Sequence, residues 1–134
     1  MSDESRVLAG ILLLALVTVE TGGLYMVRLV RGNAEATPFQ LAFARAGHAH
    51  AGVLLIPALV CQLMADATAL AGAWDWLARS GVAVAALLMP AGFFFSSMGR
   101  GRDRPNGLVA MVFTGAAVLA LGLASLGVGL LTAG

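Results

Sequence analysis

The chain has 134 residues, of which 60% are hydrophobic and 11% are charged, and its formal net charge is +1. Soluble domains average about 25% charged residues, so this composition excludes a water-soluble globule. The small net charge, without a basic stripe, also excludes a nucleic-acid partner. We predict an integral membrane protein whose surroundings are the lipid bilayer.

Four apolar stretches are long enough to cross a bilayer as helices. A hydrocarbon core about 30 Å thick requires about 20 helical residues. The predicted spans cover residues 7–30, 41–65, 76–98 and 108–131 and form a single transmembrane domain over residues 1–134. Short connections make consecutive helices antiparallel neighbours. The predicted fold is therefore all-α, a polytopic up-down-up-down four-helix bundle. Thr37 and Pro38 are typical of the cap and first residue of a helix and predict the start of the second one.

The arginines predict the orientation of the bundle. By the positive-inside rule, the first and third loops lie in the cytoplasm and both termini lie outside. Asp66 and Asp75, in and beside the second loop, are then expected to face the outer solvent. Six arginines lie in or beside the first and third loops and two lie on the other side: Arg28, Arg31, Arg45, Arg100, Arg102 and Arg104 against Arg6 and Arg79.

Small residues recur along the fourth span. Gly115, Gly122 and Gly129 follow one another at intervals of seven residues, and Ala116, Ala120 and Ala124 at intervals of four. Small side chains permit close approach between helices in lipid. They predict either ordinary packing within the bundle or a homo-oligomer formed through the fourth helix.

Glu20 and His50 are polar residues deep inside apolar spans. Glu20 lies 11 residues from Arg31 and His50 nine residues from Leu41, which is about 16 Å and about 14 Å along their helices. The two spans leave the same loop, so both side chains reach nearly the same depth. A charge in mid-bilayer costs about 2.5–3.5 kcal/mol and requires a partner. We therefore expect Glu20 and His50 to meet away from water.

The segment around His50 carries two further polar side chains, His48 and Arg45. His48 and His50 are two residues apart, about 200° around a helix, so an unbroken helix cannot present both to one ion. Arg45 and His48 are three apart and share a face. One imidazole is expected to face the first helix and Glu20, and the other to face a different helix or a second copy. The flanking glycines leave room for a neighbouring helix or a flat ligand.

The favoured function is a metal or haem site in which His50, His48 and Glu20 are the metal ligands or cofactor contacts, and Arg45 balances charge or holds a propionate-like acid. One chain offers too few ligands for structural zinc, which takes four. A homodimer would double the set and could hold a haem between facing histidines.

Two alternatives remain open at this point. An acid beside an imidazole is the recurring element of proton relays, which would fit proton-coupled transport of a small solute or ion by an oligomer. The same polar cluster would also fit a structural protein in which it only fixes helix packing. An enzyme with a soluble-type site is disfavoured, because Ser96 and Ser97 have no base in sequence reach.

Three segments resemble small, mostly uncharacterised four-helix integral membrane proteins of high-GC, actinobacterial-type bacteria. They are the residues Arg45-Ala46-Gly47-His48-Ala49-His50-Ala51-Gly52, Val19-Glu20-Thr21-Gly22-Gly23 and Arg104-Pro105-Asn106. The resemblance covers most of the chain and implies the four-helix fold and a bacterial cytoplasmic membrane, but no activity. The His-Ala-His-Ala-Gly stretch also resembles one helix of haem-copper oxidase subunit I. The chain has two histidines in all, which excludes an oxidase.

Overall fold

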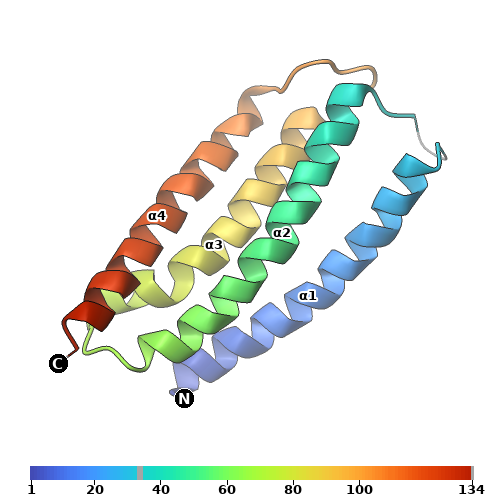
Figure 1. Cartoon of the computed structure of the whole chain (residues 1–134). Coiled ribbons are helices and arrows are strands. Elements are labelled where there is room, and N and C mark those ends of the chain that lie inside the picture. The colour runs from blue at the N-terminus through green and yellow to red at the C-terminus, as the bar shows by residue number, and fades with distance from the viewer. Residues whose placement is uncertain (33–34, 134) are drawn as a thin grey trace.

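The computed structural model describes residues 1–32 and 35–133, which form four long helices (Figure 1). They are α1 (Asp3–Val30), α2 (Pro38–Ala65), α3 (Gly72–Ser97) and α4 (Ala110–Leu131), with a short 3₁₀ helix, η1 (Gly107–Val109), before α4. All four transmembrane segments are long and apolar enough to cross a membrane. The predicted helical bundle and multi-pass membrane protein are confirmed.

The first two helices begin before their apolar runs because polar caps extend them. The side chain of Ser2 accepts a hydrogen bond from the backbone N–H of Ser5 at the start of α1. Thr37 and Gln40 form a reciprocal capping box around Pro38, as predicted for the start of α2. Such caps satisfy N–H groups that a helix end otherwise leaves unpaired. The third helix also begins early, at Gly72 rather than at residue 76.

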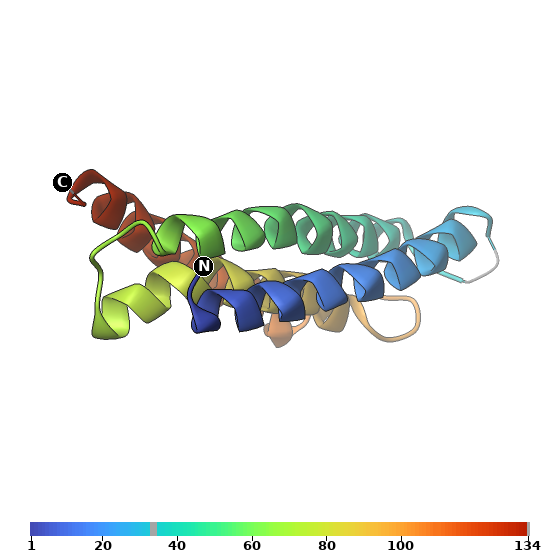
Figure 2. The ribbon, with the colours of Figure 1, turned by 90° about the horizontal axis from the view of Figure 1, so that it is seen from below.

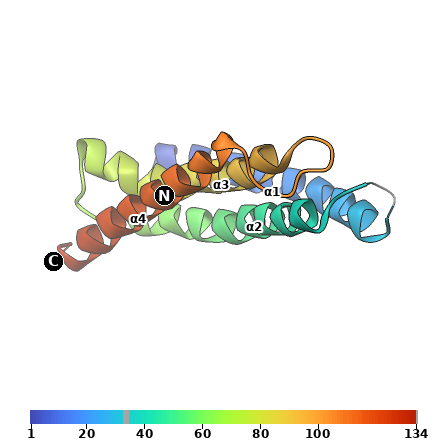
Figure 3. The same ribbon diagram turned by 90° about the horizontal axis from the view of Figure 1, so that it is seen from above.

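Helices that follow one another in the chain lie side by side. Within the described residues, α3 packs against both α2 and α4, α1 packs mainly on α2, and α1 does not touch α4. The views in Figures 2 and 3 show the helices running lengthwise along one another. Both termini lie at the end of the bundle opposite the α1–α2 and α3–α4 loops (Figure 1). The bundle is therefore open along the flank of α1.

The contact between α3 and α4 is a seam of glycines. A Cβ atom at Gly122 would lie 2.9 Å from the Cα of Gly81, so the two backbones touch. Gly115 packs against the side chain and backbone nitrogen of Met89 in α3, and Gly129 packs against the side chain of Leu70 in the α2–α3 connection. The glycines that recur every seven residues in α4 thus make contacts within one chain. The homo-oligomer through α4 stays a prediction that now rests on the alanines, which are exposed: Ala116, Ala120 and Ala124.

The distance between α1 and α2 increases as the two helices approach the α1–α2 loop (Figure 1). In its first half, Leu12 is buried against the core. Near its other end Leu29 is still buried, whereas Val27 and Val30 on either side of it are 47% and 61% exposed and line an open space next to α2. This divergence opens a groove between α1 and α2 at the loop end of the bundle.

Candidate functional site

His48 lies in a notch in α1 formed by two consecutive glycines. A Cβ atom at Gly22 would lie 3.4 Å from Nδ1 of His48, and one at Gly23 would lie 3.7 Å from Nε2. The edge of the imidazole ring therefore runs along the bare backbone of α1. His48 is half-buried there. One imidazole was expected to face the first helix and Glu20. His48 faces the first helix, but at Gly22 and Gly23, whereas Glu20 is exposed on the other side of α1.

A groove of about 370 Å³ begins at His48 and runs towards the loop end of the bundle. Its walls are the last two turns of α1 and the first half of α2, and almost all of its exposed surface is apolar. Arg45 and His48, which the sequence places on one face of α2, both line it. The complete lining consists of Met26, Val27, Val30, Arg31, Arg45, His48 and Ala49.

The side chains of two arginines belong to the lining of this groove, mainly through their apolar stems, because almost none of the lining surface is polar. Arg31 comes from the end of α1 and Arg45 from the second turn of α2, and both are exposed. Neither has an acidic partner within 4 Å in the described part of the chain, whereas Arg6 and Arg79 do. Arg31 entered the predicted orientation of the bundle, but its position in the groove was not predicted. The hairpin of the first two spans could have revealed it, because both arginines lie near that turn.

His50 lies outside the groove and faces α3. Its ring centroid is 5.0 Å from that of Phe93, and its Nδ1 is 2.7 Å from the carbonyl oxygen of Ala46. The N–H at Nδ1 donates to that carbonyl, which leaves Nε2 with its lone pair. The room expected beside Gly47 is filled, since a Cβ there would lie 3.0 Å from the ring of Phe94. A side chain, not a flat ligand, occupies this position.

The predicted meeting of Glu20 and His50 is wrong for a single chain. Glu20 is exposed on the outer surface of α1, whereas His50 packs against Phe93 of α3. No ion pair or hydrogen bond joins them in the described residues. Their equal depth follows from the hairpin, but the direction in which each side chain points follows from the rotation of each helix about its axis. Gly22 and Gly23 turn towards α2, and Glu20 is turned outward as a result.

A metal centre built from one chain does not form in the part of the chain that the structure describes. No three histidine, cysteine, aspartate or glutamate side chains come together there as a group that could hold a metal ion. The predicted ligands are dispersed, with His48 in the groove, His50 against α3 and Glu20 on the outer surface of α1. Cys61 is buried and free. A metal site within one chain is therefore not supported, and a site shared between two copies stays a prediction.

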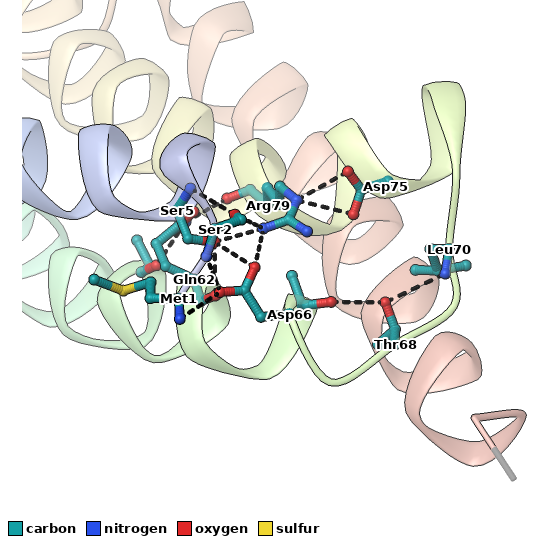
Figure 4. A network of polar contacts seen from close by, with 11 residues as sticks. Met1, Ser2, Ser5, Gln62, Asp66, Thr68, Leu70, Asp75 and Arg79 are labelled. Carbon is teal, nitrogen blue, oxygen red and sulfur yellow. Dashed lines mark hydrogen bonds and ion pairs between the residues drawn. The ribbon is translucent and has the colours of Figure 1, made fainter.

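A second polar cluster lies at the end of the bundle that carries the termini (Figure 4). It was not predicted from the sequence. Arg79 of α3 donates from Nε to both carboxylate oxygens of Asp75 at 2.9 Å, and from Nη1 to Asp66 at 2.7 Å and to the hydroxyl groups of Ser2 and Ser5. Both aspartates were expected to face solvent. Asp66 is exposed and Asp75 is partly buried, and both form ion pairs with Arg79. The spacing of four residues between Asp75 and Arg79 was the available signal.

This Arg79 cluster fastens three helices to one another. The hydroxyl of Ser5 in α1 donates to the backbone carbonyl of Gln62 in α2, and Nε2 of Gln62 donates to that of Arg79 in α3. The hydrogen bonds that Asp66 accepts from Arg79 and from the backbone N–H of Ser2 hold the pKa of Asp66 well below its ordinary value. Because the Nε and Nη1 donors of Arg79 are used within the chain, we assign the cluster a structural role.

Comparisons of the chain with protein families, curated proteins and solved structures give no match. The resemblance to small four-helix membrane proteins of high-GC bacteria stays a prediction. Function is therefore inferred from the geometry of the groove at His48.

Proposed function

We propose that the chain binds a single-chain anionic amphiphile, a long-chain carboxylate, in the groove between α1 and α2. The observation that supports this most strongly is the composition of the groove wall. An almost wholly apolar surface, lined by Met26, Val27 and Val30, lies beside the side chains of Arg31 and Arg45, which have no acidic partner among the described residues.

The size and charge of the groove select this class of ligand. A volume of about 370 Å³ lies near the lower end of the range of about 300–1,000 Å³ for small-molecule sites, which suits one alkyl chain better than a two-chain lipid. Guanidinium groups bind carboxylates through paired, charge-assisted hydrogen bonds. The hydrocarbon tail would lie along the apolar wall and the carboxylate would face Arg45 and Arg31.

His48 gives the site its second polar contact. It lies one helical turn from Arg45 on the same face of α2, where its ring edge is held against Gly22 and Gly23. The ring lines the end of the groove, and a rotation of the imidazole out of the glycine notch would let one N–H donate to the ligand head. By the arginine distribution, this end of the bundle faces the cytoplasm, so the ligand would enter from the cytoplasmic leaflet.

The binding test uses the detergent-purified protein and a fluorescent polyene fatty acid. We expect His48→Ala and Arg45→Gln each to weaken binding by about tenfold, the loss for one charge-assisted hydrogen bond. The matched control is His50→Ala, which removes the neighbouring imidazole outside the groove and is expected to leave the affinity unchanged. Equal losses for His48→Ala and His50→Ala, or no loss for His48→Ala, would contradict the proposal.

The haem alternative retains one supporting feature, the lone pair that His50 keeps at Nε2 while Nδ1 bonds to Ala46. A haem held by this nitrogen, or between two copies of the chain, stays a prediction. Proton-coupled transport by an oligomer, through Glu20 and an imidazole such as that of His50, also stays a prediction.

A further inference from the structure

Glu20 has an environment that a single copy of the chain does not explain. It lies ten residues before Val30, about 15 Å along α1 from that end, and it is exposed on the outer surface of the helix. Ionisable side chains inside a membrane almost always face a bundle interior, a cavity or a partner group. Glu20 has no hydrogen-bond or ion-pair partner among the described residues.

The other polar side chains in the middle of α1 are satisfied by the helix itself. The hydroxyl group of Thr18 donates to the carbonyl of Ala15, and that of Thr21 donates to the carbonyl of Thr18. Both threonines can therefore face lipid without an unpaired polar group. Glu20 differs from them because its carboxyl group has no such internal acceptor or donor, so it marks the side of α1 that requires a partner.

Glu20 is the centre of a regular row on that side. Leu13, Val17, Glu20 and Leu24 follow at alternating steps of four and three residues, and each of the three apolar members is more than half exposed. This alternation is the spacing of a left-handed helix pair, and most helix pairs in membranes are left-handed. A single polar side chain within such a row fixes the register of the two helices.

We propose that this row of α1 packs against the same row of a second copy of the chain, with the two Glu20 carboxyl groups hydrogen-bonded to each other. In a twofold dimer whose axis is parallel to the bilayer normal, equivalent residues of the two copies lie at the same depth in the membrane. The Glu20 side chain of one copy can therefore face that of the other. The O–H of one protonated carboxyl group donates to an oxygen of the other. The pair therefore requires at least one bound proton, since two carboxylates would repel each other.

The exposed row on α1 is a better contact surface for a second copy than the histidines of α2. His48 is turned against Gly22 and Gly23, and His50 against Phe93, so neither imidazole is presented on the outer face of α1. Of the four transmembrane segments, α1 buries the smallest share of its residues inside the chain. It also has no contact with α4 in the described residues, so its outer flank is open to a partner.

The experiment is disulfide cross-linking of the full chain in native membranes with copper phenanthroline, using single cysteines in a Cys61→Ala background. We expect Leu13→Cys and Leu24→Cys to form covalent dimers. The controls are Thr18→Cys and Tyr25→Cys, also exposed on α1 but outside the row, and we expect them to remain monomeric. Cross-linking of equal strength at all four positions, or none at Leu13 and Leu24, would overturn the proposal.

Variants of Glu20 test the carboxyl pair itself. In the Leu24→Cys background, Glu20→Gln should retain the dimer, because an amide can still hydrogen-bond to its copy across the interface. Glu20→Leu should lose it, although leucine suits a lipid-exposed position and leaves the fold intact. A dimer of undiminished yield in Glu20→Leu would show that the helices pair without the carboxyl groups and would refute the proposed contact.

Discussion

Replacing Arg79 by methionine is expected to destabilise the bundle by about 1–3 kcal/mol, because it removes the charged hydrogen-bond donor that the buried hydroxyl group of Ser5 shares with Asp66 and Asp75. Arg79 is 8% exposed and is the common partner of Asp66 and Asp75. Its loss also removes the donor that joins Ser5 of α1 to α3. Methionine has a similar length and suits an apolar helix, so the change isolates the hydrogen bonds and the charge.

The measurement is reversible unfolding in mixed micelles with increasing dodecyl sulfate, followed by circular dichroism. The control is Arg6→Met at the same end of the bundle. Arg6 pairs with Asp3 three residues away, and both side chains are largely exposed, so an effect below about 0.5 kcal/mol is expected. An Arg79→Met protein as stable as Arg6→Met would contradict the role given to the Arg79 cluster.

Substitution of Gly81 by leucine is expected to have the second large effect, a loss of about 2–3 kcal/mol or failure of α4 to dock. A Cβ at Gly81 would lie 2.7 Å from the Cα of Gly122, closer than non-bonded carbon atoms approach. The obstructing atoms are backbone atoms, so no side-chain rotation relieves the clash. The two helices would have to separate along the whole seam, which loses the close packing that holds helices together in lipid.

Gly127→Leu is the matched control for the glycine seam, since Gly127 lies in α4 and a Cβ there meets no atom within 4 Å. Leucine is expected to be tolerated at that position. The same unfolding assay compares the two variants. If Gly127→Leu destabilised the protein as much as Gly81→Leu, the damage would come from the loss of glycine rather than from the contact between α3 and α4.

The fold could be predicted from the sequence because the bilayer imposes strong constraints on it. Four apolar runs of sufficient length and short connections leave an antiparallel bundle as the simplest arrangement. Thr37 and Pro38 marked the start of α2 correctly because capping depends only on neighbouring residues. The seven-residue spacing of Gly115, Gly122 and Gly129 indicated a close helix contact, but spacing alone could not tell whether the other helix belongs to the same chain.

The candidate site could be predicted only in part. The shared face of Arg45 and His48 follows from helix geometry, and both residues line the groove. The pairing of Glu20 with His50 failed because depth along a helix says nothing about rotation around it. That rotation depends on which residues of α1 permit close contact, and Gly22 and Gly23 decide it. Such a contact involves two helices at once and leaves no local signal.

The Arg79 cluster was missed for a related reason. Its members come from the start of α1, the end of α2 and the second turn of α3, so they are distant in sequence. Counting charges treats Arg79, Asp66 and Asp75 as independent loop residues. The structure instead brings them together because the N-terminus of α1 and the α2–α3 connection lie at one end of the bundle (Figure 4).

The most direct test of the proposed ligand groove is photolabelling of the purified protein with a long-chain carboxylate that carries a diazirine on its tail. Digestion and mass spectrometry then locate the label. We expect labelling of Met26, Val27 and Val30 in α1, and we expect excess unlabelled fatty acid and His48→Ala each to reduce it. Labelling spread with equal yield over exposed apolar residues of α4, such as Phe113 and Leu121, and insensitive to His48→Ala, would contradict it.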